Sequence, residues 1–342
     1  MHYNHLGGSG LKVSEVGFGT ATFGGIGDAF QAWGSTDLKE AKQLIALCMD
    51  HGVNMFDTAN VYSSGRAEEI LGAALEGRRA DVLISTKASF PTSHNPNDYG
   101  ASRHSLVRAC EASLRRLATD YIDVYYIHGF DETTPVEETL RALDDLTREG
   151  KVRYIGCSNF SGWQLMKSLA TSDRYGLARY VAHQAYYSLV ARELEWELMP
   201  LASDQKVGTV VWSALAGGAL SGKLGRGRTV PAESRLMRDE FLKGTRSENL
   251  YEIVDVLEQI ALEIGRTVAQ VALRWVLQRP TVVSIVLGAR NEMQLEQNLG
   301  AIGWCLSEAQ IRRLNAVSEF PAAYPYWYQR RHPINGRGER QS

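Results

Sequence analysis

The chain has 342 residues, of which 44% are hydrophobic and 22% charged, with a formal net charge of −2. This composition is ordinary for a globular domain with a large core. The near balance of charge argues against nucleic acid or an anionic membrane as the main partner, since both usually require a basic surface. No apolar run resembles a signal peptide or approaches the ~20 residues of a membrane-spanning helix. We therefore expect a soluble cytoplasmic protein.

The cysteines are widely spaced, with no CxxC pair and no neighbouring histidine pattern. This distribution favours buried thiols in a reducing compartment over disulfides or a zinc site, and we expect no bound metal. The four residues are Cys48, Cys110, Cys157 and Cys305.

Short apolar segments alternate with amphipathic helical segments along the chain. The expected strands are Val16–Phe18, Val53–Phe56, Val82–Thr86, Ile122–Ile127, Val152–Cys157, Tyr180–Ala185, Val207–Ser213 and Val282–Leu287. The helices expected after them are 37–50, 67–75, one containing 106–117, 136–148, one from about 161, 194–202 and 293–302. Eight such units in about 300 residues favour an α/β fold, a closed (β/α)8 TIM barrel, over an open doubly wound sheet.

Three segments lie outside this repeat. Leu6–Val13, with its glycines, predicts a β-hairpin before the barrel, and Gly217–Ser247 predicts a long loop after the seventh strand. Loops of that length are usually functional. No linker divides the chain, so we expect one barrel domain over residues 1–320 and a C-terminal tail over 321–342 that contributes to a substrate pocket.

Polar and aromatic residues follow the expected strands, at the end where (β/α)8 barrels carry their active sites. Asp57 and Tyr62 follow the second strand, Lys87 the third and His128 the fourth. Taken singly, these residues are typical of a helix cap, a loop aromatic, a surface lysine and a rim histidine. Their arrival at three neighbouring strand ends favours a shared catalytic site.

The motifs around these residues resemble those of the aldo-keto reductase family, and of its bacterial-type members in particular. They are DTANVYSSGRAEEILG, STK ending at Lys87, YYIHG around His128, GKVRYIGCSNF, WSALAGGALSGK and GARNEMQLEQN. The resemblance covers about residues 5–320. It implies a barrel that reversibly reduces an aldehyde or ketone, a small-molecule carbonyl substrate, with a nicotinamide cofactor and without a Rossmann fold. The absence of G-x-G-x-x-G after the first strand agrees with this.

The chemistry follows from the residue types. Hydride delivery to a carbonyl carbon leaves negative charge on oxygen, so a proton donor must be close. A tyrosine with its ordinary pKa of ~10 is a poor donor, and a nearby ammonium lowers that pKa by favouring the phenolate. Lys87 can supply the charge, and Asp57 can hold Lys87 protonated. His128 can donate a hydrogen bond to the substrate oxygen. By resemblance, Tyr62 is the acid in reduction and the base in oxidation.

The resemblance also implies a set of cofactor contacts, among them side chains that hydrogen-bond the nicotinamide carboxamide, an aromatic ring that stacks on the nicotinamide, and an arginine for the adenosine end. The expected residues are Gly19, Thr20, Asp57, Ser158, Asn159, Gln184, Trp212, Ser213, Leu215, Gly217, Gly222, Lys223, Gly288, Arg290, Gln294, Gln297 and Asn298. Other readings are a helix cap for Ser158–Asn159 and a packed core residue for Trp212.

The expected cofactor is NADPH/NADP, with NADH as the alternative. Arg290 suits a ribose 2′-phosphate, but some family branches carry arginine where this chain has Gln294 and glutamate where it has Gln297. No motif specifies an oligomeric state.

Aromatic residues are expected to line the substrate pocket and to suit apolar or cyclic carbonyl compounds. They are Phe23, Trp33, Phe90, Phe130, Tyr324 and Trp327.

Two other functions fit the pattern of residues less well than a carbonyl reductase does. One is a cofactor-binding regulatory or redox-sensing subunit with slow turnover, since the family includes subunits of potassium channels. The other is an aldolase with Lys87 as a Schiff-base nucleophile, which leaves Asp57 and Tyr62 unexplained.

Overall fold

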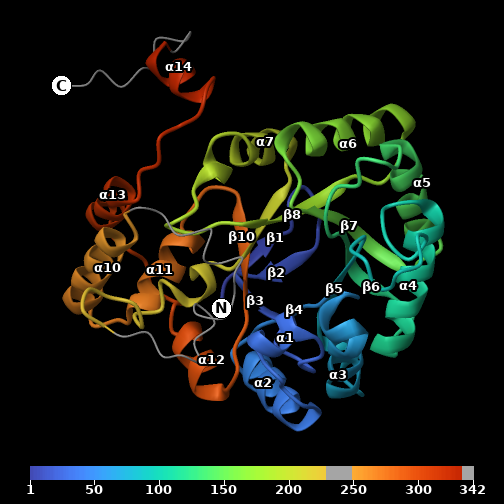
Figure 1. The fold of residues 1–342 in the computed structure, drawn as a ribbon, viewed down its shortest axis with the longest axis horizontal. Helices are drawn as coiled ribbons and strands as arrows, with labels where there is room; N and C mark the ends of the chain where they lie inside the picture. Colours follow the sequence, from blue (N-terminus) through green and yellow to red (C-terminus); the bar gives the residue numbers. More distant parts are fainter. Residues whose placement is uncertain (229–248, 333–342) are drawn as a thin grey trace.

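Eight parallel strands close into a barrel in the computed structural model, which describes residues 1–228 and 249–332 (Figure 1). The strands are β3 (Val16–Gly19), β4 (Met55–Asp57), β5 (Leu83–Ala88), β6 (Ile122–Ile127), β7 (Val152–Ser158), β8 (Tyr180–Tyr186), β9 (Gly208–Trp212) and β10 (Val282–Leu287). Each strand pairs with the next along the chain, and β10 closes the barrel by pairing with β3. The predicted (β/α)8 barrel is confirmed, with strand ends displaced by at most two residues.

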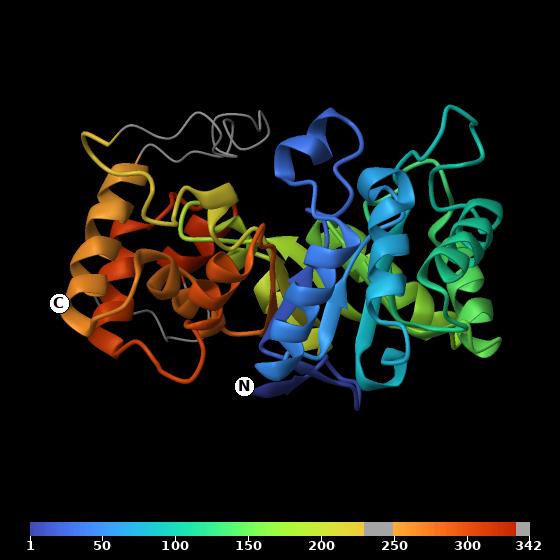
Figure 2. The ribbon, with the colours of Figure 1, turned by 90° about the horizontal axis from the view of Figure 1, so that it is seen from below.

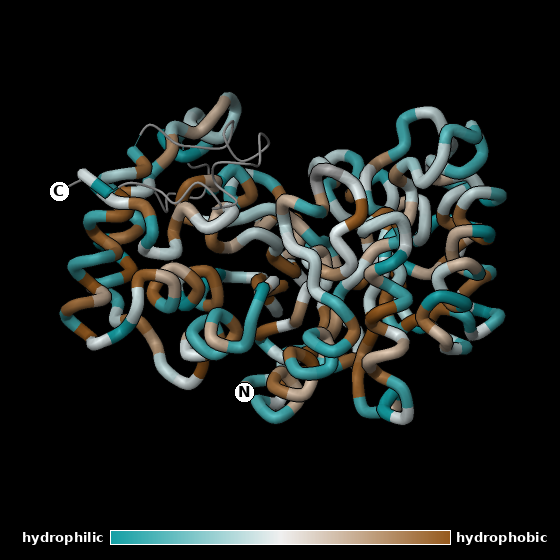
Figure 3. Tube along the Cα trace, turned by 60° about the horizontal axis from the view of Figure 1, so that its bottom comes forward, coloured by the Kyte–Doolittle hydropathy of each residue, from teal (hydrophilic) through white to brown (hydrophobic). Residues whose placement is uncertain are grey.

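Helices surround the barrel and turn their apolar faces toward it (Figures 1 and 3). They include α2 (Leu38–Asp50), α3 (Arg66–Ala74), α4 (Arg103–Leu117), α5 (Val136–Arg148), α6 (Gly162–Tyr175), α7 (Leu198–Gln205) and α12 (Glu292–Leu299). Local signals set several starts: Asp37 caps α2 in a capping box, and Pro135 precedes α5. Ser161 is the N-cap residue of α6, at the start expected for that helix.

Several further helices were not predicted from the sequence. They include α1 (Asp28–Trp33), α10 (Leu250–Ile264), α11 (Val268–Leu277) and α13 (Glu308–Val317). In α10 the buried residues Ile253, Leu257 and Ile260 recur at helical spacing, so a signal was present. The helix expected over 194–202 is divided into the short turn η3 (Glu193–Glu195) and α7.

The N-terminal hairpin covers one end of the barrel, and the segment containing α1 lies at the other (Figure 2). Its strands β1 (Tyr3–His5) and β2 (Lys12–Ser14) are antiparallel, so the expected hairpin is confirmed with longer bounds. Leu6 and Val13 are fully buried and pack with barrel-interior residues that include Met55 and Tyr126. The hairpin therefore seals the end of the barrel opposite the strands' carboxyl ends.

The loop after β9 and the C-terminal tail are described in part. The loop contains the turn η4 (Ala216–Gly218), and residues 229–247 of the predicted loop lie outside the described residues. The tail forms α14 (Tyr326–Arg331), where Tyr326 stacks on Trp196 with ring centroids 6.2 Å apart. Residues 333–342 of the predicted tail also lie outside the described residues.

The cysteines are free thiols. Cys48, Cys110 and Cys157 are buried as predicted, but the prediction is wrong for Cys305, which is exposed. Cys305 lies in the connection between α12 and α13, where its side chain is within 3.7 Å of the Arg274 guanidinium.

The hairpin turn depends on glycine at position 7. Gly7 has a φ of +59°, and a Cβ there would lie 2.2 Å from the carbonyl oxygen of Val181. We expect Gly7→Ala to lower the free energy of unfolding by about 2–4 kcal/mol, through left-handed strain and overpacking. A Cβ at Gly10 would meet none of the described residues beyond its chain neighbours within 4 Å, so Gly10→Ala is the matched control. Chemical denaturation followed by circular dichroism gives both values; equal stability of the two variants would contradict the sealing role.

Candidate active site

A buried ion pair lies at the centre of the site. Asp57 ends β4 and Lys87 lies in the adjoining β5, with side chains 3% and 0% exposed. The Lys87 ammonium donates to the Asp57 carboxylate and, over 2.8 Å, to the carbonyl oxygen of Thr58. The Tyr62 hydroxyl lies 3.5 Å from the same nitrogen. The three residues thus share one hydrogen-bonded cluster, in which Asp57 and Lys87 are buried and Tyr62 is half-buried.

The surroundings keep Lys87 charged. Burial alone would lower the pKa of Lys87, but the attraction of Asp57, supported by Tyr62, more than offsets it and leaves that pKa above its ordinary value. Asp57 is fixed in turn, because Ser85 Oγ and Gln184 Nε2 donate to its second oxygen over 2.6 and 3.0 Å. Both oxygens of the carboxylate are therefore occupied.

Tyr62 is presented by a left-handed turn. It opens η1 (Tyr62–Gly65), in which Ser63 and Ser64 have φ angles of 48° and 55°. Ser63 Oγ donates to the carbonyl oxygen of Phe23 over 2.7 Å, which anchors the turn to the loop after β3. The ring of Phe30, in α1, lies 5.6 Å from the Tyr62 ring. Phe30 was not predicted, since no pattern in the sequence gives the course of this loop.

His128 follows β6 and faces Tyr62. Its ring meets the Tyr62 ring edge-on at 5.9 Å and stacks on Phe90 at 4.3 Å. Burial, and then the charge of Lys87, hold the pKa of His128 well below its ordinary value. The imidazole is accordingly neutral at neutral pH. Its buried Nδ1 has no hydrogen-bond partner among the described residues.

Amide and aromatic side chains adjoin His128 on the next strand ends. Asn159 Nδ2 donates to the carbonyl oxygen of His128 over 2.9 Å and to Ser158 Oγ over 3.0 Å. Trp212 Nε1 donates to Asn159 Oδ1 over 3.2 Å, and the Trp212 ring stacks on Tyr186 at 5.0 Å. The cap of α6 is Ser161, so the reading of Ser158–Asn159 as that cap is wrong.

The remaining expected cofactor residues lie on the same rim. Thr20 follows Gly19 at the end of β3, and its N–H donates to the Asp57 carbonyl oxygen over 2.9 Å. The buried Oγ1 of Thr20 has no hydrogen-bond partner within the described part of the chain. Ser213 Oγ accepts from the Gly217 N–H over 3.0 Å, and Gly217 and Gly222 have φ angles of 63° and 84°. Leu215 is half-buried and Lys223 exposed in the same loop.

Arg290 does not stand free at the end of β10. Its Nε donates to the Trp33 carbonyl oxygen over 2.9 Å and one terminal nitrogen to that of Ala32 over 2.7 Å. Its backbone N–H donates to Gln294 Oε1 over 3.0 Å. Arg290 thus connects the start of α12 to the end of α1. Close by, Gly288 and Gln297 are exposed and Asn298 is buried.

The expected aromatic wall is only partly assembled. Phe90 and Trp33 lie near Tyr62 and His128, Trp33 through its contact with Phe30 at 5.4 Å. Phe23 is fully buried and packs on Phe18 in the core, so its prediction as a pocket wall is wrong. Tyr324 and Trp327 lie in the tail, and their role at a substrate pocket stays a prediction.

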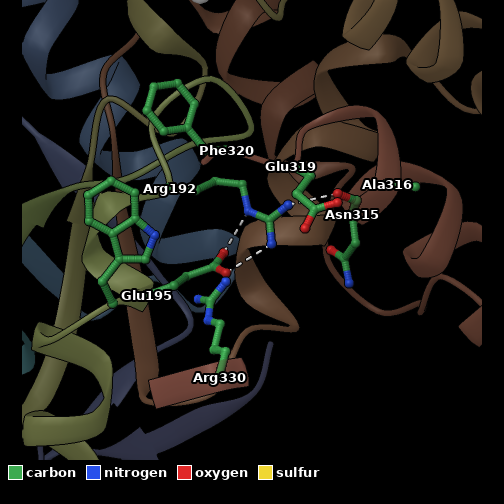
Figure 4. Close-up of a pocket in the computed structure, with 8 residues that line it drawn as sticks. Arg192, Glu195, Asn315, Ala316, Glu319, Phe320 and Arg330 are labelled. Atoms are coloured by element: carbon green, nitrogen blue, oxygen red, sulfur yellow. Dashed lines mark hydrogen bonds and ion pairs between the residues drawn. The ribbon is translucent and has the colours of Figure 1, made fainter. Parts of the chain in front are cut away.

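A separate cavity of about 290 Å³ lies between the loop after β8, α13 and the tail (Figure 4). It is lined by Arg192, Glu195, Trp196, Asn315, Ala316, Glu319, Phe320 and Arg330. Arg192 and Glu195 face one another and form two hydrogen bonds of 2.8 Å. Arg192 also donates to Asn315 and Ser318, so this guanidinium fastens α13 to the barrel.

The model of the Aldo/keto reductase family matches residues 15–319, which include the whole cluster around Lys87. The chain belongs to the aldo/keto reductase family. Among the similar proteins, "Probable voltage-gated potassium channel subunit beta" of Arabidopsis thaliana is 40% identical over 310 residues, 88% of this chain and 91% of that protein.

Two enzymes are similar to this aldo/keto reductase over most of its length. "Aldo-keto reductase YhdN" of Bacillus subtilis is 33% identical over 322 residues, 93% of this chain and 94% of that protein. "Versiconal hemiacetal acetate reductase" of Aspergillus parasiticus is 34% identical over 345 residues, 95% of this chain and 99% of that protein.

Membrane-spanning helices and clustered metal ligands are both absent from residues 1–228 and 249–332. None of the helices in these ranges combines the length and apolarity that crossing a bilayer demands. Within the same residues, no group of three or more histidine, cysteine, aspartate or glutamate side chains is arranged to hold a metal ion.

Proposed function

We propose that this aldo/keto reductase reduces aldehydes or ketones to alcohols with NADPH, reversibly, and that Tyr62 donates the proton. The observation that supports this most strongly is the buried Lys87 ammonium, held between the Asp57 carboxylate and the Tyr62 hydroxyl. A carbonyl reductase needs a proton donor whose conjugate base is stabilised. An ammonium 3.5 Å from a phenol provides that stabilisation.

The roles of the residues follow from their contacts. When bound, the cofactor supplies hydride to the carbonyl carbon. Tyr62 then gives its proton to the carbonyl oxygen, and Lys87 stabilises the phenolate that remains. Asp57 keeps Lys87 charged and fixed. His128, neutral at neutral pH, can donate a hydrogen bond that orients the carbonyl and stabilises its developing charge.

The residues present fit a nicotinamide cofactor. The buried hydroxyl of Thr20 has no partner among the described residues, and amide groups of Asn159 and Gln184 lie beside the Lys87 cluster. The stacked Tyr186–Trp212 pair offers an aromatic surface next to those amides. These groups would hold the nicotinamide end. The pyrophosphate would be enclosed by the loop that contains Ser213, Leu215, Gly217, Gly222 and Lys223.

Replacing the proposed acid gives the first functional test. We expect Tyr62→Phe to lower kcat for reduction of a reactive aromatic aldehyde by about 10²–10⁴-fold, because the hydroxyl that transfers the proton is lost. The Kd of the cofactor, measured by quenching of tryptophan fluorescence, should stay within about threefold of the original as a control on folding and binding. Unchanged turnover would exclude Tyr62 as the acid.

We also propose that Arg290 selects NADPH over NADH. A guanidinium has five N–H donors, and the carbonyls of Trp33 and Ala32 take two of them. The remaining donors can bind a ribose 2′-phosphate without releasing α1. Gln294, Gln297 and Asn298, on the helix that begins beside Arg290, would complete the adenosine end, with Gly288 allowing close approach.

Paired titrations test this preference. We expect Arg290→Gln to weaken NADPH binding by about 10–100-fold, since a hydrogen bond to a charged group is lost, and to change NADH binding by less than about threefold. NADH serves as the internal control, because it lacks the 2′-phosphate, and any displacement of α1 would affect its binding as well. An equal loss for both cofactors would show that Arg290 acts through α1 alone.

A second candidate function is a cofactor-binding regulatory or redox-sensing subunit with slow turnover. The 40% identity to proteins named as probable potassium channel β subunits favours it. Steady-state turnover with a panel of carbonyl compounds separates the two. Tight cofactor binding with one slow hydride transfer and no sustained turnover would favour the regulatory subunit, whereas sustained turnover favours the enzyme.

The cellular setting belongs to the same proposal. We place the protein in the cytoplasm, since its four cysteines are free thiols, as a reducing compartment would keep them. Its partner in this proposal is a small carbonyl compound, and the formal net charge of −2 argues against nucleic acid.

A further inference from the structure

Phe90 and His128 are brought together by neighbouring strands. β5 and β6 pair in parallel with Ala88 opposite Ile127, so the residues that follow each strand emerge side by side. The two rings stack with centroids 4.3 Å apart and an interplanar angle of 26°. Phe90 is 40% exposed, so core packing does not account for the position of this ring.

The backbone on both sides of the stack is specialised. Ser89 has a φ of 121°, a left-handed conformation that a residue other than glycine adopts only when its surroundings enforce it. Its Oγ accepts from the Gly129 N–H and donates to the Gly129 carbonyl oxygen, each over 3.1 Å. One hydroxyl therefore clamps the residue after His128 to the residue before Phe90.

Gly129 is required by the ring of Phe90. A Cβ at position 129 would lie 2.7 Å from Cε1 and 3.2 Å from Cζ of that ring, too close for the ring to stay in place. The backbone of Gly129 is not left-handed, so glycine is needed here for the space that its missing side chain leaves. Ser89 and Gly129 thus provide the seat in which Phe90 stacks on His128.

The His128 ring has little else to fix its rotation. The backbone of His128 is anchored, since its N–H donates to Ala88 and its carbonyl accepts from Asn159. The ring nitrogen Nδ1, however, is buried with no hydrogen-bond partner among the described residues. The ring is held between Phe90, on which it stacks, and Tyr62, whose ring it meets in a T-shaped arrangement. Its orientation therefore depends on aromatic packing.

We propose that Phe90, seated by Ser89 and Gly129, is a positioning residue that holds the His128 imidazole in the orientation facing Tyr62. Its effect on catalysis rests on the proposed carbonyl reduction, whereas its effect on the ring does not. Loss of the stack would let the imidazole rotate away from the substrate oxygen and would admit water beside it.

The sign of the accompanying pH effect follows from the charges that face His128. Among the described residues, Lys87 and Tyr62 are titratable groups that face His128 from neighbouring elements, with Asp57 behind Lys87. Burial is the main cause of the low pKa of His128, so admitted water raises that pKa toward its ordinary value. The imidazolium then forms at a higher pH, and the acid limb of the plot of kcat against pH shifts to higher pH.

Three variants test the proposal. Phe90→Leu keeps bulk but removes the ring, Gly129→Ala displaces the ring, and Phe90→Tyr retains it. The histidine ring resonances of the unliganded protein, recorded by NMR from about pH 4 to 8 to span the ordinary histidine pKa, report the orientation and pKa of His128 whether or not the protein is a reductase. Steady-state kinetics with an aromatic aldehyde are measured alongside, with Gly10→Ala as the control for an unobstructed glycine.

We expect Phe90→Leu and Gly129→Ala to lose the close ring contacts of His128 with Tyr62, to raise its pKa and to lower kcat by about 10–100-fold, as loss of alignment does. Phe90→Tyr should match the unaltered protein in the ring contacts of His128, in the pKa of His128 and in kcat. His128 signals that are the same in Phe90→Leu, Gly129→Ala and the unaltered protein would overturn the proposal. If the ring signals change but no variant, nor the original protein, turns over, the positioning stands and the proposed reduction fails.

Discussion

The buried ion pair between Lys87 and Asp57 is the interaction on which the site depends. Removing two charges from water costs several kcal/mol per ion, and only close pairing with further hydrogen bonds offsets that cost. Here Ser85 and Gln184 donate to Asp57, and the Thr58 carbonyl accepts from Lys87. The pKa of Lys87 is higher in the folded protein than its ordinary value of 10.5. The contribution of Lys87 to the free energy of unfolding is therefore complete below pH 10.5 and is lost as pH rises through the pKa of the folded protein.

The barrel converts this pair into a site by presenting side chains at neighbouring strand ends. Several rim residues other than glycine have left-handed backbones, including Ser63, Ser89, Asn159 and Ser213. Such conformations cost about 1–3 kcal/mol each and persist only where surrounding contacts enforce them. Their concentration around Lys87 indicates that the fold gives up some stability to aim Tyr62, His128 and the amide groups.

The sequence predicted the barrel because apolar runs of strand length are a local signal. It also predicted that Asp57, Tyr62, Lys87 and His128 lie together, because they follow closely after those runs. Phe30 was missed because its approach to Tyr62 depends on the course of a loop with no periodicity. The partners of Arg290 were missed for a related reason, since backbone carbonyls such as that of Trp33 carry no residue identity. Helix α10 was missed although its spacing was readable, because the predicted loop Gly217–Ser247 adjoins it and its start has no side-chain cap.

The central claim is that Asp57 maintains a charged Lys87 beside Tyr62. The most direct measurement is an NMR titration of the Lys87 side chain in the unliganded protein and in Asp57→Asn, where the shape of the group is kept and its charge removed. The account predicts that Lys87 stays an ammonium beyond pH 10.5 in the original protein and loses its proton below that pH in Asp57→Asn, since the attraction of Asp57 no longer offsets burial. Identical titration of Lys87 in both proteins would contradict it.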